Sequence, residues 1–63
     1  MITINEFMHE YEVSLERLAY FGIKERDVNI FGDEPLKELP DELKTSFMAA
    51  LEVYGYFMEG VGI

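Results

Sequence analysis

Glu6 and His9 are the residues whose types and spacing come nearest to a reactive site. The spacing Glu-x-x-His places a carboxylate and an imidazole one helical turn apart, as in the di-iron carboxylate sites of helical bundles. Glu52 or Glu59 could supply the other carboxylates of such a site. Such ligands must project into a helical core, whereas Glu6 and His9 lie on the side of the expected first helix away from its apolar residues. We therefore expect a solvated pair that holds neither a metal nor another cofactor.

The other residue types with catalytic potential lack a sequence context that would activate them. Ser14, Thr45 and Ser46 would all depend on one histidine as the base. Thirteen acidic residues make carboxylate pairs easy to nominate and therefore uninformative. The chain contains no cysteine, which excludes disulfides and thiolate metal sites, and no glycine-rich phosphate loop precedes a helix. We predict that the protein is not an enzyme and has no small-molecule substrate.

The size and charge of the chain limit its class of function. Sixty-three residues form at most one small domain, which usually needs a disulfide, a metal or a partner for support. The net charge of −8 repels nucleic acid and anionic membranes and favours a basic protein partner. No apolar run approaches a membrane span, and no basic and apolar leader opens the sequence. We predict a single domain over residues 1–63, located in the cytoplasm, without direct contact to nucleic acid or membrane.

The first half of the sequence predicts one long helix. Thr3 to Glu6 form a capping box, and apolar residues then recur at steps of four and three along one face. Gly22 is typical of a left-handed C-terminal cap with a hydrophobic contact after it. This pattern predicts a helix over residues 4–21, with an alternative break near Val13 and Ser14.

The second half predicts another long helix after an irregular connection. Pro40 and the two acidic residues after it are typical of a helix start, and we expect that helix to end at Gly60. Residues 22–39 mix charges with glycine and proline, and a short helical turn after Pro35 would point two leucines inward. Within that stretch we expect a short strand-like or single-turn segment at Val28, Ile30 and Phe31. The predicted fold is all-α, a helical hairpin of two main helices joined by a short structured connection.

The final helix is expected to be apolar on two sides. At 100° per residue, the face that contains Leu43 and Phe47 can pack on the first helix, while Ala49, Val53 and Tyr56 lie opposite. Since a helix that is apolar all round is normally buried, we predict a protein interface there, most simply a homodimer through this helix. The first helix shows a weaker second apolar face. The predicted interface residues are Ala49, Val53, Tyr56, Val13 and Tyr20.

The acidic residues gather in two stretches, one on the first helix and one from the connection to the start of the second helix. The plainer interpretation is a solvated surface that keeps an apolar-rich protein soluble. The alternative is a surface that binds a basic groove, since carboxylates that meet Lys and Arg give fast, salt-sensitive association. The predicted acidic surface comprises Glu10, Glu12, Glu16, Asp33, Glu34, Glu38, Asp41 and Glu42.

Residues 3–22 can also be divided into a helix, a turn at Glu12 to Ser14, and a second helix capped by Ser14. This pattern resembles the DNA-reading half of small winged-helix or repressor-type domains, and the resemblance implies a transcriptional regulator. Its second helix offers only Arg17 beside Glu16, whereas DNA-binding proteins draw most of their affinity from Lys and Arg on phosphates.

These features favour a small regulator or inhibitor that binds another protein and blocks a basic, nucleic-acid-binding surface on it. Short, acidic chains without cysteine are frequent among phage and mobile-element proteins that disable host machinery, and we expect such an origin here. The alternatives are a degenerate helix-turn-helix transcriptional regulator and a structural subunit of a larger assembly.

Overall fold

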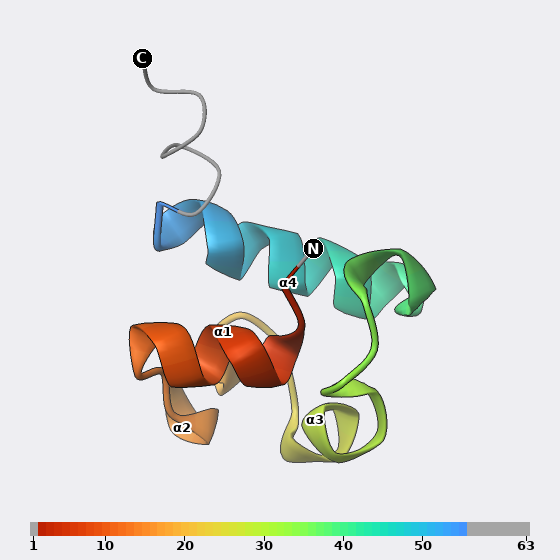
Figure 1. The fold of residues 1–63 in the computed structure, drawn as a ribbon, viewed down its shortest axis with the longest axis horizontal. Coiled ribbons are helices and arrows are strands. Elements are labelled where there is room, and N and C mark those ends of the chain that lie inside the picture. The colour runs from red at the N-terminus through yellow and green to blue at the C-terminus, as the bar shows by residue number, and fades with distance from the viewer. Residues whose placement is uncertain (1, 56–63) are drawn as a thin grey trace.

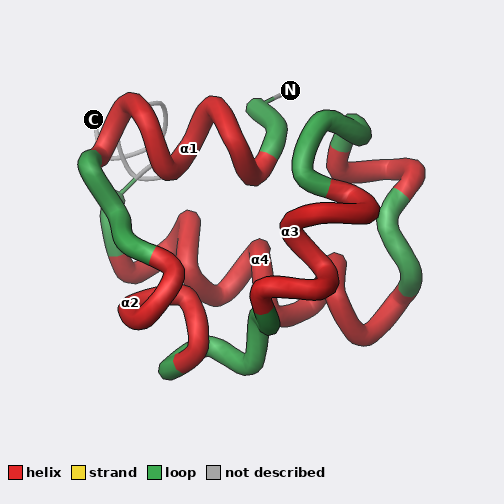
Figure 2. The backbone as a smooth tube through the Cα atoms, turned by 90° about the horizontal axis from the view of Figure 1, so that it is seen from below, coloured by secondary structure: helices red, strands yellow, loops and turns green. Residues whose placement is uncertain are grey.

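Residues 2–55 are described by the computed structural model, and within that range the fold is all-helical, without strands. The predicted all-α class is therefore confirmed. The longest helix, α4, runs along one side of the molecule, with α1, α2 and α3 on the other side of the core (Figure 1), and the view from below places these three in front of it (Figure 2). The elements in chain order are α1 (Ile4–Tyr11), α2 (Leu15–Ala19), α3 (Glu25–Phe31), the 3-10 turn η1 (Leu36–Glu38) and α4 (Asp41–Val53).

The first helix begins at the predicted capping box. The Thr3 hydroxyl accepts the backbone N–H of Glu6 at 3.1 Å, and the Glu6 carboxylate accepts the backbone N–H of Thr3 at 2.9 Å. Two N–H groups that have no partner inside the helix are thereby satisfied. The Glu6 side chain therefore takes part in the N-terminal cap of α1.

A left-handed residue at Glu12 ends α1 after eight residues. Glu12 has φ 54° and ψ 48°, and the backbone N–H groups of Glu12 and Val13 both donate to the Met8 carbonyl. Ser14 then begins α2, because its hydroxyl accepts the Arg17 N–H at 3.1 Å. The continuous helix over residues 4–21 is therefore wrong, and the alternative break near Val13 and Ser14 is confirmed.

Replacing Glu12 by glycine is expected to stabilise the protein. The left-handed conformation costs a residue with a side chain about 1–2 kcal/mol. Glycine adopts it without this cost but loses more conformational entropy on folding. We expect Glu12→Gly to raise the free energy of unfolding by about 0.5–1 kcal/mol in urea titrations. Glu12→Gln makes the same charge change and keeps the side chain, so it should leave stability unchanged. An equal gain in both variants would assign the effect to charge.

The predicted cap at Gly22 is present. Gly22 has φ +88°, and the N–H of Ile23 donates back to the Leu18 carbonyl at 3.1 Å. Leu18 and Ile23 are both buried, which gives the hydrophobic contact that accompanies this type of helix end.

A short helix, α3, replaces the strand-like or single-turn segment expected at Val28, Ile30 and Phe31. It starts at Lys24, whose backbone N–H donates to the Asp27 carboxylate at 3.1 Å. Val28 is buried, whereas Ile30 is 60% exposed. The side chains of Val28 and Phe31, one helical turn apart, pack against the core and hold α3 there.

Both prolines stand immediately before helical turns. Pro35 precedes η1, and Leu36 and Leu39 are buried as predicted. Pro40 precedes α4, which confirms the predicted start of the second long helix. The end expected for that helix at Gly60 lies outside the described residues.

The predicted antiparallel hairpin is not what the chain forms, because α1 and α4 run in the same general direction in Figure 1. The break at Glu12 turns the chain, and α2, α3 and η1 carry it back before α4 begins. Contacts between α1 and the end of α3 fix this course. The N–H of Asn5 donates to the Gly32 carbonyl at 3.0 Å, and the Asn5 amide donates to the Asp33 carboxylate at 2.7 Å.

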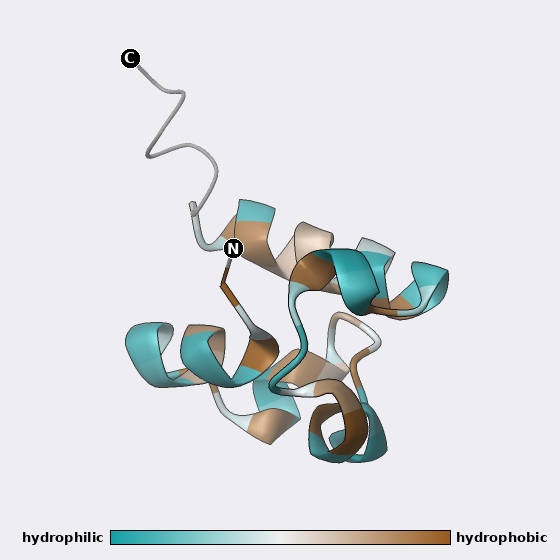
Figure 3. Ribbon diagram, turned by 45° about the vertical axis from the view of Figure 1, so that its right-hand side comes forward, coloured by the Kyte–Doolittle hydropathy of each residue, from teal (hydrophilic) through white to brown (hydrophobic). Residues whose placement is uncertain are grey.

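A single hydrophobic core joins every element. Its centre is aromatic, with the ring of Phe7 5.5 Å from Phe47 and 5.3 Å from Tyr54, both in edge-to-face geometry. In Figure 3, α1 and α4 carry both hydrophobic and hydrophilic stretches, as expected of helices that bury one side. The buried residues are Ile2, Ile4, Phe7, Val13, Leu18, Ile23, Val28, Leu36, Leu39, Leu43, Phe47, Ala50 and Leu51.

Candidate functional site

The helix α4 has one face in the core and one in solvent. Leu43, Phe47, Ala50 and Leu51 are buried. The exposed residues lie on the opposite side of the helix and combine apolar groups with three carboxylates and no base. This outer face of α4 consists of Asp41, Glu42, Thr45, Met48, Ala49, Glu52 and Val53.

Of the five residues predicted for an interface, the structure exposes three. Ala49 lies on the outer face of α4, as does Val53, which is 70% exposed. Tyr20 is 78% exposed, and the guanidinium carbon of Arg17 lies 5.8 Å from the centre of its ring. Tyr56 lies outside the described residues.

Val13 is the exception, and its assignment to an interface has to be corrected. It is only 6% exposed and belongs to the core. The prediction assumed a continuous first helix, in which Val13 would face away from the main apolar side. The left-handed conformation of Glu12 ends the helix first and directs the next residue inward.

A shallow hollow occupies the middle of the outer face of α4. It has a volume of about 370 Å³ and is lined by Thr45, Met48, Ala49 and Glu52. Met48 is 42% exposed. Among these residues, only Ala49 belongs to the interface predicted from the sequence. The signal that was available is their spacing of i, i+3, i+4 and i+7 on the side of the helix opposite Leu43.

All eight acidic residues predicted to form a surface are exposed, but they form two separate groups. Glu10, Glu12 and Glu16 surround the turn between α1 and α2. The other group lies around η1 and the start of α4, toward the other end of the longest axis (Figure 1). We call this second group the acidic edge. It consists of Asp33, Glu34, Glu38, Asp41 and Glu42.

The acidic edge carries much of the charge of the protein. Residues 33–42 hold five acids and one base, Lys37, which gives −4 (−5 + 1) out of a net charge of −8. Its last two members, Asp41 and Glu42, are also the first residues of α4, where a negative charge is favoured by the helix dipole. The acidic edge therefore continues directly into the outer face of α4.

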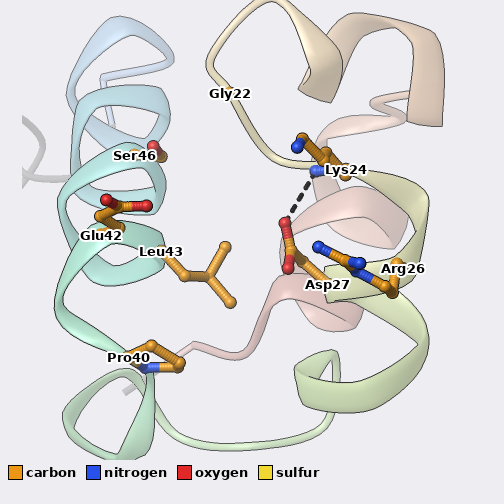
Figure 4. A pocket seen from close by; sticks show the side chains of 8 residues that line it. All are labelled: Gly22, Lys24, Arg26, Asp27, Pro40, Glu42, Leu43 and Ser46. Atoms are coloured by element: carbon orange, nitrogen blue, oxygen red, sulfur yellow. Dashed lines mark hydrogen bonds between the residues drawn. The ribbon is translucent and has the colours of Figure 1, made fainter.

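A small cleft separates the start of α3 from α4 (Figure 4). Its volume is about 180 Å³, below the roughly 300–1,000 Å³ of pockets that enclose a small-molecule ligand. Lys24 and Arg26 lie on the α3 side and Glu42 on the α4 side, with Asp27 held by the Lys24 N–H. The lining residues are Gly22, Lys24, Arg26, Asp27, Pro40, Glu42, Leu43 and Ser46. This mixture of opposite charges does not favour a ligand of one sign.

The described residues contain no further feature that points to chemistry. Within residues 2–55 no charged or polar side chain is buried, and no group of three or more His, Asp or Glu residues could hold a metal ion. His9 is exposed. The helices of this range are also too short or too polar to cross a membrane.

Comparisons with known proteins add no assignment. No protein-family model matches the sequence, and neither a curated protein nor a solved structure matches the chain. The surface, charge and helix geometry of the chain itself are therefore the basis for inferring its function.

Proposed function

We propose that this chain is a non-enzymatic regulator or inhibitor that binds a basic surface on another protein. The acidic edge is the observation that carries this proposal, because half of the net charge lies in ten consecutive residues that continue into the outer face of α4, where Met48, Ala49 and Val53 are exposed. Surfaces that bind nucleic acid are lined by Lys and Arg. A partner held there by the acidic edge would lose access to nucleic acid.

The partner in this proposal is a different protein, and a second copy of the chain is disfavoured by charge. The outer face of α4 has Asp41 and Glu42 at one end and Glu52 near the other, and the one base of the helix, Lys44, is half-buried beside this face. Pairing two copies of α4 in parallel would place these acids beside their own equivalents. Antiparallel pairing would place Glu52 beside the Asp41 and Glu42 of the other copy. Like charges are opposed in both orientations.

A DNA-binding role is the second candidate, because the break at Glu12 and the cap at Ser14 give the helix-turn-helix division its expected form. The chemistry of that region opposes it. Residues 4–20 hold four acids and one base, Arg17, for a charge of −3 (−4 + 1). The helix α2, which would have to enter a DNA groove, has five residues. We therefore expect no binding to duplex DNA at low salt.

Two matched triple variants test the proposed function. Glu34→Gln, Glu38→Gln and Glu42→Gln neutralise the acidic edge, whereas the same change at Glu10, Glu12 and Glu16 neutralises the turn between α1 and α2. Each set removes three charges and includes one first-turn glutamate, Glu42 of α4 or Glu16 of α2.

The full chain and both variants would be immobilised and exposed to a nuclease-treated cell extract at low and raised salt. At low salt, we expect basic proteins to bind the parent chain and the variant changed at Glu10, Glu12 and Glu16 (the Glu10 set). We expect them not to bind the variant changed at Glu34, Glu38 and Glu42 (the Glu34 set), and to be released from the parent chain at raised salt. Equal capture by both variants, or capture that salt does not weaken, would overturn the proposal.

A further inference from the structure

The hollow on the outer face of α4 has the geometry that receives a side chain from another helix. Thr45, Met48, Ala49 and Glu52 are four neighbouring positions of one helix surface, spaced i, i+3, i+4 and i+7. When two helices pack side by side, each inserted side chain of one helix fills a hole formed by four residues of the other. Ala49 forms one side of this hole, and its short side chain leaves room there for an inserted group.

The inward neighbours of the hollow hold it in a fixed place. Phe47, Ala50 and Leu51 are completely buried, so α4 cannot rotate to cover its outer face without removing them from the core. The Thr45 hydroxyl donates to the Asp41 carbonyl at 3.0 Å, which fixes one rim of the hollow. The outer face of α4 therefore keeps its orientation in the folded chain.

Resting on the proposed protein-binding function, we infer that the outer face of α4 binds one basic amphipathic helix of the partner. An apolar side chain of that helix occupies the hollow, and contacts with Met48 and Val53 extend the apolar area. This assigns a secondary structure to the part of the partner that binds, which the acidic edge alone does not specify.

Charge on the outer face of α4 defines the rest of the partner helix. Asp41 and Glu52 stand at opposite ends of the hollow, eleven residues apart, or about 16 Å at 1.5 Å per residue. A partner helix that packs along α4 would need two basic residues about the same distance apart, one on each side of the apolar residue that enters the hollow. Lys or Arg at these positions pairs with Asp41, Glu42 and Glu52.

A designed peptide tests this inference with the full chain. The probe is a fluorescently labelled helix of roughly 18 residues built from Leu, Lys and Ala, long enough to form a helix in solution. Its leucines lie on one face, and its lysines flank them. A scrambled peptide of the same composition has no apolar face. Binding is measured by fluorescence anisotropy at low and raised salt.

The matched variants are Ala49→Lys and Ala19→Lys. Both alanines are exposed helix residues, and both changes alter the net charge from −8 to −7. Ala49→Lys fills the hollow and repels the probe, so we expect it to weaken binding about tenfold or more, whereas Ala19→Lys should stay within about twofold. Met48→Ser and its control Ile30→Ser form a second pair that adds no charge. This pair replaces the first if Ala49→Lys reduces the helical circular dichroism signal, and Met48→Ser should then weaken binding more than Ile30→Ser.

The outcomes separate this inference from the proposed function. Equal weakening by Ala49→Lys and Ala19→Lys, or equal affinity for the scrambled peptide, would show that charge alone attracts the probe. The inferred helix site would then be wrong while the proposed function stood. Absence of probe binding would also contradict the inferred helix-binding site. The proposed function would then be tested separately, by the capture experiment with the Glu34 and Glu10 sets. A sedimentation result that shows dimers broken by Ala49→Lys would assign the face to a second copy.

Discussion

Phe47→Ala is expected to unfold most of the protein at room temperature. Phe47 is fully buried, and its ring packs edge-to-face on Phe7 at 5.5 Å in the centre of the core. Truncating a buried phenylalanine costs about 3–5 kcal/mol through lost transfer energy and the cavity that remains. A core of this size rarely supplies more than about 3–5 kcal/mol in total. Circular dichroism should therefore show that most of the helical signal is lost before any denaturant is added.

The adjacent residue is the control for this prediction. Met48 lies on the outer face of α4 and is 42% exposed, so Met48→Ala removes a side chain of similar length from the same helix without opening the core. We expect it to change the free energy of unfolding by less than about 1 kcal/mol. If Phe47→Ala and Met48→Ala had similar stability, the assignment of the two faces of α4 would be contradicted.

Gly32→Ala should produce the second largest loss of stability. Gly32 is buried where α3 ends against α1, and a Cβ atom there would clash with the Val28 carbonyl oxygen and would lie 2.7 Å from the Asn5 amide nitrogen. Both neighbours are held in place. The Val28 carbonyl is a backbone group that accepts the Gly32 N–H, and Asn5 is held by its backbone N–H on the Gly32 carbonyl and by its side-chain amide on the Asp33 carboxylate. Overpacking of this kind costs about 1–3 kcal/mol. The cost should appear as a lower midpoint in urea with an unchanged slope.

A double-mutant cycle with Asn5→Ala locates the origin of that loss. Asn5→Ala removes the side-chain part of the clash but leaves the Val28 carbonyl in place, so it should recover only part of the cost of Gly32→Ala. Strict additivity of the two changes would mean that the steric contact between α1 and Gly32 is absent in solution.

Helix ends were the features best predicted from the sequence, because each depends on a few local residues. The capping box of Thr3 and Glu6, the left-handed Gly22 and the prolines before η1 and α4 all lie where short-range chemistry places them. Such contacts involve residues three or four positions apart, and their recognition needs no knowledge of the tertiary fold.

The break in the first helix was harder to predict, because the residue responsible carries no strong signal. Apolar spacing from Ile4 to Leu18 fits one continuous helix as well as two short ones. The turn depends on Glu12 in the left-handed region, where glycine or asparagine is the usual residue. Tertiary packing, which buries Val13 and Leu18 together, decides between the two arrangements.

The expectation of one continuous first helix also explains why the sequence predicts a hairpin in place of the observed arrangement of four helices within residues 2–55. If residues 4–21 form one helix, too few residues remain for the separate helices α2 and α3. An antiparallel hairpin is then the simplest fold for two long helices. The seven residues of α3 present only Val28 and Phe31 to the core, which is too short a pattern to separate a helix from a strand.

Prediction of the candidate surface succeeded where it depended on α4 and failed where it depended on the first helix. Ala49 and Val53 are exposed, because Leu43 and Phe47 fix the orientation of a long helix. Val13 is buried, because its expected face belonged to a helix that ends earlier. The two groups of acids correspond to the two acidic stretches of the sequence, whereas their positions toward opposite ends of the molecule depend on the path of the chain, which sequence spacing does not reveal.

The binding region on α4 can be mapped most directly by nuclear magnetic resonance. Isotope-labelled full chain would be titrated with the basic helical peptide, and amide shifts would be followed residue by residue. If the outer face of α4 binds the peptide, we expect the largest changes at Asp41, Thr45, Ala49 and Glu52, while the amide shifts of Glu10 and Glu16 stay unchanged. Shifts concentrated at the turn between α1 and α2, or spread evenly over all acidic residues, would contradict it.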